Sequence, residues 1–234
     1  MMRQTLDAGL PELGLDLPES ARRTLCDFGA AVIKQNEVMN LTAITQPDQV
    51  AKLHLLDSLT VLTAADLRGK QIIDVGCGAG FPGVPLAIAC PEAQVTLLDS
   101  LGKRVDFLRE GCEQLGLKNV TCVHARAEEF AAGHRERFDI ATSRAVAQLN
   151  VLSELTLPLV KVGGNFLAMK GASGEEELTA ARGAIKKLGG EYRETRTLHL
   201  PGGDTRTLIL CKKISQTPTA YPRNGGKIAK SPLK

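Results

Sequence analysis

The sequence predicts an α/β fold, in which a mostly parallel sheet of seven strands ends in an antiparallel hairpin and follows an N-terminal helical cap. Three observations predict it. Short apolar runs alternate with helical stretches after residue 69, only Pro201–Asp204 joins the last two runs, and two helical patterns precede the first run. Strands that alternate with helices form a parallel sheet covered on both faces. Four residues leave no room for a helix, so the last two runs form a hairpin.

The elements follow in order. The cap has a helical pattern over 18–38, entered at Pro18, and a second that begins near Pro47 and runs towards Leu62. Strand-like runs lie at 71–75, 94–98, 120–124, 138–143, 164–169, 192–198 and 206–212. Helical stretches lie at about 83–90, 102–115, 148–160 and 175–188. This layout resembles that of the Rossmann-like class I methyltransferases.

The composition indicates one compact domain with an additional N-terminal segment. The chain has 234 residues, of which 43% are apolar, enough for a sizeable core. We divide it into a helical cap (1–66), a core (67–214) and a basic tail (215–234), and we expect a monomer. Aromatic residues make up only 3%, which argues against an RNA binder that stacks successive bases on aromatic faces.

The cysteines and the N-terminus indicate a reduced, cytoplasmic protein. None of the six cysteines belongs to a C-x-x-C pair or to a Cys/His cluster with zinc spacing, so no metal is expected. The early acid Asp7 and the lack of a long apolar run argue against a signal peptide. No run approaches the ~18 residues that a membrane span requires, so no membrane partner is expected.

The end of the chain is basic. The segment from Lys212 to Lys234 contains six Lys and Arg residues and no Asp or Glu. Its prolines and its Gly225–Gly226 pair predict a mobile or loosely packed tail. A solvated end and a contact with a polyanion are equally good interpretations of this segment.

The first strand leads into the most informative segment. Asp74 stands near its end, and Gly76, Gly78 and Gly80 alternate in the loop that follows. Ligands of open α/β sheets bind beyond the carboxyl ends of the strands, where glycines let the backbone come close without Cβ clashes. A tight turn without a ligand is the alternative, and three alternating glycines make it a poorer explanation.

The second strand also ends in an acid, Asp99, which can accept hydrogen bonds from the vicinal hydroxyls of a ribose. Two such carboxylates suit a ligand with an amine, a ribose and little phosphate, such as S-adenosylmethionine. Gly78–Gly83 also matches G-x-G-x-x-G, so a dinucleotide is the alternative. Asp74 would repel its pyrophosphate, and Pro82 removes a backbone N–H from the turn. An N-cap role for Asp99, with help from Ser100, also stays open.

Longer motifs carry a specific resemblance. They are, in chain order, Asn40–Thr42, His54–Leu59, Asp74–Gly83, Leu97–Arg104, Ser143–Ala145 and Tyr221–Arg223. These motifs span nearly the whole chain and resemble the bacterial 16S rRNA guanine-N7 methyltransferase family (RsmG, also called glucose-inhibited division protein B, GidB). Ile228 is a departure, because a proline is common there in the family.

The resemblance implies transfer of a methyl group from S-adenosyl-L-methionine to N7 of one guanine of 16S rRNA, in the small ribosomal subunit. With the residues above, it implies a cofactor site made of Asp74, Gly76, Gly78, Gly80, Phe81, Asp99, Ser100, Ala127, Glu128 and Arg144. It implies RNA contacts from Lys103, Arg104, Arg126, Arg144 and Lys170. A non-catalytic RNA-binding module and a small-molecule methyltransferase remain the alternatives.

The implied chemistry needs no general base. N7 of guanine has a free lone pair and no proton, so the enzyme has to align the acceptor with the methyl group. The four histidines are scattered along the chain. Arg144 follows the fourth strand and is expected to position the reactants, with a structural ion pair as the alternative. His54 and Asp57 are expected to form a buried hydrogen-bonded pair that joins the cap to the core.

Overall fold

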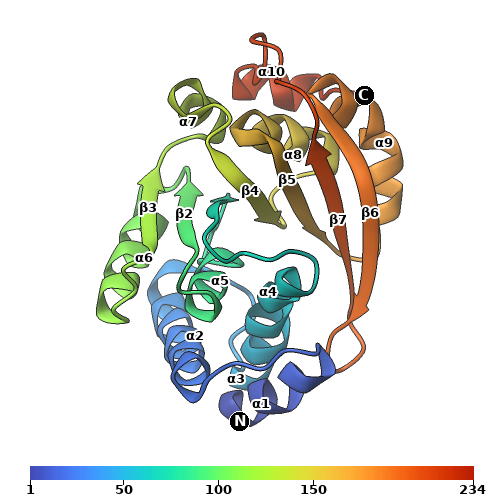
Figure 1. Cartoon of the computed structure of the whole chain (residues 1–234). Helices are drawn as coiled ribbons and strands as arrows, with labels where there is room; N and C mark the ends of the chain where they lie inside the picture. The colour runs from blue at the N-terminus through green and yellow to red at the C-terminus, as the bar shows by residue number, and fades with distance from the viewer.

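The computed structural model describes residues 1–234 and is built around one seven-stranded sheet (Figure 1). The strand order is β3-β2-β1-β4-β5-β7-β6. The strands are β1 (Gln71–Val75), β2 (Gln94–Asp99), β3 (Val120–His124), β4 (Phe138–Arg144), β5 (Val160–Lys170), β6 (Gly190–His199) and β7 (Thr205–Lys213). The first five pair in parallel, whereas β7 is antiparallel to β5 and β6. The predicted parallel sheet with a terminal hairpin is confirmed.

β5 extends further beyond its predicted range than any other strand. β5 begins at Val160, directly after the short 3-10 helix η3 (Leu157–Leu159). Gly163, with a φ of +88°, and Gly164 interrupt the apolar alternation of its first half. Glycines inside a strand mark irregular pairing, and here the register against β4 shifts near the start of the strand.

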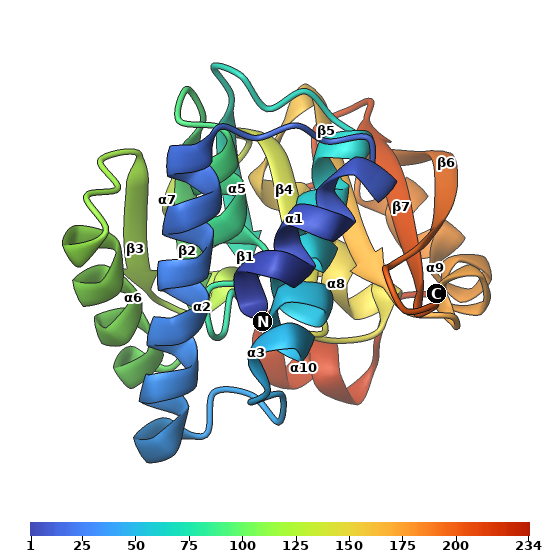
Figure 2. The ribbon, with the colours of Figure 1, turned by 90° about the horizontal axis from the view of Figure 1, so that it is seen from below.

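Helices cover both faces of the sheet (Figures 1 and 2). One face packs against α1 (Met2–Glu12), α2 (Glu19–Met39), α4 (Asp57–Leu59), α5 (Gly83–Ala89) and α6 (Gly102–Gln114). The other packs against α7 (Ala127–His134), α8 (Leu149–Thr156) and α9 (Gly174–Lys187). Alternate residues of one strand serve the two cores: Ile72 joins the first, and Ile73 the second. None of the helices combines the length and apolar character that a membrane crossing requires.

The cap is more irregular than predicted. The single helix expected from Pro47 is a succession of α3 (Pro47–Val50), the π-helix η1 (Ala51–Leu56), α4 and the 3-10 helix η2 (Thr60–Thr63). A π-helical stretch inside a helix is rare and is often found at functional sites, and this one carries His54. The pattern also missed α1, which contains Pro11 and has no side-chain cap.

Two further short helices were not predicted. α7 has only eight residues, and its available signal was the acidic first turn, Glu128 and Glu129, which favours a helix N-terminus. The second is α10 (Gly225–Lys230) in the tail. Both owe their stability mainly to packing, because isolated helices this short are marginal in water.

The prediction of a loosely packed tail is wrong. Arg223 pairs with the carboxylate of Glu154, which is fully buried on α8, through Nη2 and Oε2 at 2.6 Å. Ile228 and Leu233 turn inward and are buried. Composition could not reveal this, because Arg223 and its partner are 69 residues apart. The predicted segment 215–234 thus continues the domain's packed structure.

Candidate active site

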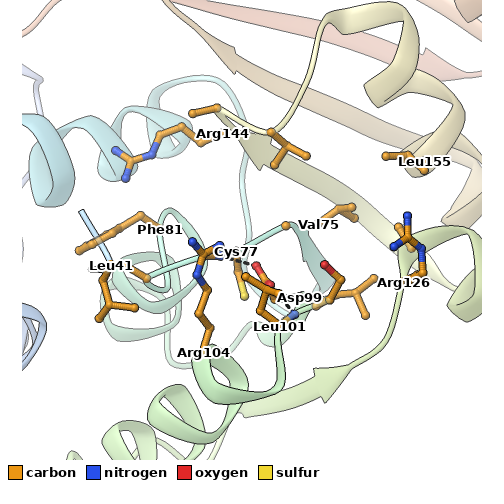
Figure 3. A pocket seen from close by; sticks show the side chains of 18 of the residues that line it. Leu41, Val75, Cys77, Phe81, Asp99, Leu101, Arg104, Arg126, Arg144 and Leu155 are labelled. Atoms are coloured by element: carbon orange, nitrogen blue, oxygen red, sulfur yellow. Dashed lines mark hydrogen bonds between the residues drawn. The ribbon is translucent and has the colours of Figure 1, made fainter. Parts of the chain in front are cut away.

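A cavity of about 500 Å³ opens at the carboxyl ends of the parallel strands (Figure 3). The loops after β1, β2, β3 and β4 line it, and the cap closes it with Leu41, Thr42 and His54. At this point the sheet order reverses, since β2 and β3 lie on one side of β1 and β4 lies on the other. Open α/β sheets bind their ligands at such a switch point, and the volume suits a small molecule.

The loop between β1 and α5 forms the floor of this cavity. Gly76, Gly78 and Gly80 all have positive φ, a conformation that strains other residues. Gly76 also needs its small size, because a Cβ there would lie 2.5 Å from a methyl group of Val146. Gly80 differs from the prediction: it does not line the cavity but packs against Phe28 and Leu108 in the core. Its role is to turn the chain.

Asp99 lies on the cavity wall, and each of its carboxylate oxygens accepts one backbone N–H. Oδ2 accepts from Gly78 and Oδ1 from Leu101, both at 2.9 Å. Each oxygen keeps a second lone pair for a ligand. The alternative N-cap role is not seen, because α6 begins after Leu101 and has no side-chain cap. Ser100 lines the cavity without capping the helix.

Asp74 requires a correction. Its side chain is fully buried, is not part of the cavity lining and points to α5, where Oδ2 accepts the Gly83 N–H at 2.8 Å. Asp74 therefore does not face the cavity in which a ligand ammonium was expected. Oδ1 has no partner, and neither has Oγ1 of Thr142, which lies opposite in the β1–β4 register. The strand-end position was read correctly, but the sequence could not tell which side of the loop the carboxylate faces.

We expect Asp74 to make folding stability depend on pH. Burial raises the pKa of its carboxyl to about 7, against opposing contributions from the Gly83 N–H and Arg144. From about pH 4 to 7 the unfolded chain has lost this proton and the folded chain keeps it, so the free energy of unfolding falls as pH rises and then levels off. Asp74→Asn should flatten this slope in denaturant unfolding at pH 5 and pH 8. Thr142→Val is the control and should keep it; an unchanged slope in Asp74→Asn would contradict the assignment.

Arg144 joins the cap to the sheet. Its guanidinium donates to Oδ2 of Asp57 and to the Leu53 carbonyl, each at 2.8 Å, and lies over the Phe81 ring at 5.2 Å. Figure 3 places it with Phe81 at one end of the cavity. His54 and Asp57 are both buried as predicted, but they do not bond to each other, because both face Arg144.

His54 is held as a neutral ring. Burial, and then the Arg144 charge, lower its pKa to about 4. Its Nδ1 lies 3.0 Å from the Leu53 carbonyl, which can only accept, and 3.1 Å from Nη2 of Arg144, which can only donate. Its Nε2 lies 2.8 Å from the Thr42 hydroxyl, which can donate or accept, so both ring nitrogens are engaged whichever one carries the proton. The ring also stacks on Phe81, with centroids 4.6 Å apart. No free nitrogen remains to act as a base.

The opposite end of the cavity is formed by the turn after β3. Ala127 and Glu128 line it, as does Arg126, and Nε of Arg126 pairs with Oε1 of Glu128 at 2.7 Å. Leu155 from α8 provides an apolar wall beside them (Figure 3). A flat, partly polar ring would fit between this wall and the turn.

The predicted RNA-binding residues fall into two groups. Arg104 and Arg126 line the cavity, and Lys103 is exposed on the first turn of α6. Neither Lys103 nor Arg104 forms an ion pair. Lys170 differs: its ammonium is buried, lies 2.8 Å from Glu177 and donates to the Ala147 carbonyl. Lys170 therefore braces the loop after β4, and an RNA phosphate would have to displace Glu177 to reach it.

Several lining residues escaped prediction. Leu41, Thr42 and His54 come from the cap, and Val146 and Leu155 come from the far side of the sheet. No chemical signal in their residue types marks them as ligand contacts. The motifs Asn40–Thr42 and His54–Leu59 were the available pointers.

The sheet order and the cavity at its switch point define a class I methyltransferase fold. TYW2 from M. jannaschii, which was solved in complex with AdoMet, superposes with a TM-score of 0.56 at 14% identity, covering 68% of this chain and 76% of that one. TrmN from Thermus thermophilus gives 0.55 at 21% identity, covering 68% and 48%. At these identities the likeness concerns the fold.

The family follows from sequence comparison. The model of the GidB family, described as rRNA small subunit methyltransferase G, matches residues 21–209. A protein of Alkaliphilus metalliredigens named ribosomal RNA small subunit methyltransferase G is 45% identical to this chain, and the match covers 99% of each. A protein of the same name in Clostridium perfringens is 42% identical to this chain, and the match covers 100% of this chain and 98% of the other. This chain belongs to the rRNA small subunit methyltransferase G family, so the predicted resemblance is confirmed.

Proposed function

We propose that this protein transfers the methyl group of S-adenosyl-L-methionine to N7 of a guanine in the 16S rRNA of the small ribosomal subunit. The observation that carries the proposal is family membership along nearly the whole chain, together with an open cavity at the switch point of the sheet. The fold and the family agree on the reaction class, and the family supplies the nucleic-acid substrate.

The cavity residues fit the cofactor. Asp99 keeps one free lone pair on each oxygen for a ribose diol, and the backbone of the glycine loop leaves space beside it. Ala127 and Glu128 would hold the adenine against Leu155. The bound cofactor supplies a sulfonium methyl group that is activated for nucleophilic attack. Arg144 and Phe81 then define the end of the cavity at which the acceptor arrives.

A dinucleotide fits less well. Its pyrophosphate would need free N–H groups at the start of α5. The Gly83 N–H is already bonded to the Asp74 carboxylate, and Pro82 has none. A second phosphate-binding position at this turn is therefore missing, which supports S-adenosylmethionine over NAD.

The acceptor base has a place to enter. A second cavity of about 580 Å³ shares His54, Arg144, Ala145 and Val146 with the first and contains Arg206 on its other side. Nε of Arg206 pairs with Oδ1 of Asp57 at 2.9 Å, so the same carboxylate holds two arginines. We place the guanine in this second cavity, next to Arg144.

Catalysis in this arrangement is alignment. The lone pair of N7 attacks the methyl carbon in line with the departing sulfur, and no proton has to be removed. The absence of a free imidazole agrees with this, since both His54 nitrogens are engaged. Holding the reactants in line can contribute about 7–11 kcal/mol to lowering the barrier.

The test uses labelled S-adenosylmethionine and small ribosomal subunits that lack the modification. Label should enter 16S rRNA, and borohydride and aniline cleavage should map it to N7 of one guanine. Calorimetry should detect cofactor binding, whereas a non-catalytic RNA-binding module would give no heat. A small-molecule methyltransferase would bind the cofactor but would not label RNA. RNA affinity should fall steeply as salt rises, because counterions are released.

A further inference from the structure

The last thirty residues of the chain contain no acidic side chain. After Asp204, the sequence holds Lys and Arg residues as its only charged groups. Lys227, Lys230 and Lys234 are exposed, and none of them takes part in an ion pair. We call residues 215–234 the basic arm. Ammonium groups that are held near one another without counter-charges repel each other, so a fixed arm that carries them suits an anionic partner.

The arm is held in a fixed position. Besides Nη2, the backbone N and Nε of Arg223 donate to the buried Glu154, and its Nη1 donates to the carbonyl of Ser231, which closes the arm on itself. Arg135 donates to the carbonyls of Thr217 and Tyr221. A buried carboxylate that loses its only cation destabilises a protein strongly, so this ion pair keeps the arm in place.

The anchoring directs the lysines outward. Ile228 lies between Lys227 and Lys230 in sequence and is 2% exposed, so α10 presents its apolar residue to α8 and its lysines to solvent. Lys227 and Lys230 are three residues apart and therefore lie near each other on one side of the helix. The Asn150 side chain binds the Leu233 carbonyl, which fixes the chain just before Lys234.

The helix α10 of the arm begins beside the cavity. A Cβ at Gly225 would collide with the Glu128 carboxylate and lie 2.7 Å from Nη2 of Arg126. Both of these residues line the cavity. In Figure 1, α10 lies at the same end of the molecule as α7 and α8. The start of α10, which carries Lys227, thus adjoins Arg126 at the cavity rim.

We infer that the basic arm binds the phosphate backbone of the RNA whose guanine enters the cavity, through Lys227, Lys230 and Lys234. The inference rests on the proposed function. Flexible ammonium groups suit phosphates at varied positions and carry no sequence information. A membrane surface fits poorly, because binding there needs an exposed apolar face, and Ile228 and Leu233 are buried.

The test compares two triple variants of the full chain with the same change in charge. The first is Lys227→Gln, Lys230→Gln and Lys234→Gln. The control is Arg23→Gln, Lys70→Gln and Lys118→Gln, three exposed basic residues away from the arm: Lys70 and Lys118 precede β1 and β3, and Arg23 lies on α2 between Ala21 and Thr24, which line a pocket together with Lys118. Methyl transfer to small ribosomal subunits is measured over a range of salt concentrations, and cofactor affinity is measured by calorimetry.

The arm variant should raise the KM for the subunit about tenfold at physiological salt, with kcat and cofactor affinity unchanged. The slope of log(kcat/KM) against log[salt] should become shallower by about 2, from three lost contacts of ~0.7 each. Equal effects in both variants, no effect in the arm variant, or a matching loss of cofactor affinity would overturn the inference. Failure of the wild-type protein to label RNA would instead refute the proposed function.

Discussion

Replacing Arg144 with alanine is expected to lower kcat for methyl transfer to RNA by about 100-fold or more, since small misplacements of reacting groups have effects of this size. Arg144 borders both cavities, covers the Phe81 ring and fixes His54. Without it, the end of the cavity at which the acceptor meets the methyl group loses its shape. Single-turnover assays at saturating RNA and cofactor measure the effect.

The sheet should survive this substitution. Asp57 keeps one cation, because Arg206 still pairs with its other oxygen. Some stability is lost with the Asp57 contact, so the melting temperature has to be measured and the assay run well below it. Arg144→Lys is the matched control: it keeps the charge but cannot donate to Asp57, Leu53 and His54 together.

The lysine variant should recover part of kcat without a change in cofactor affinity. If Arg144 were only a structural ion pair, alanine and lysine variants would lower the melting temperature while kcat at saturation stayed normal. Near-normal kcat in Arg144→Ala would therefore remove Arg144 from the reaction.

Replacing Asp99 with alanine is expected to weaken S-adenosylmethionine binding by about 100-fold or more, since each hydrogen bond to a charged group contributes roughly 1.5–3 kcal/mol. The carboxylate would hold the ribose and, through the Gly78 N–H, also the glycine loop. Both are lost together. Isothermal calorimetry with the cofactor alone measures the change without involving RNA.

Asp99→Asn separates the two contributions. Its amide oxygen can keep the Leu101 contact, whereas its NH₂ cannot accept the Gly78 N–H. We expect an intermediate affinity. The domain should stay folded in both variants, because Asp99 contributes little to the apolar cores. A large drop in melting temperature with unchanged cofactor affinity would show that Asp99 is structural.

Much of the architecture was predictable, because it follows from patterns among neighbouring residues in the sequence. Each strand-like run, the short Pro201–Asp204 connection and the glycine loop is a pattern that spans only a few neighbouring residues. The alternation of Ile72 and Ile73 between the two cores follows from the period of a strand. The position of Asp99 on the cavity wall was predictable from the same reasoning, since a strand-end acid beside a glycine loop faces the switch point of the sheet.

The predictions that differ from the structure concern burial, which depends on residues far away in the sequence. Asp74 and Lys170 were expected to contact ligands, and the structure buries both. Their residue types and strand-end positions were correct, but burial depends on what the rest of the chain packs over them. Asp74 is covered by the start of α5, and Lys170 is matched by Glu177 on α9.

The sequence by itself determined the order and type of the main elements, the switch point and the family motifs. Only the tertiary structure decided that the cap closes the cavity, that Arg144 gathers His54 and Asp57, and that the basic arm is fixed on Glu154. The physical reason is distance along the chain. Periodicity and turn chemistry act between neighbours, whereas an ion pair such as Arg144–Asp57 joins residues 87 positions apart and forms only when the folded core brings them together and excludes water.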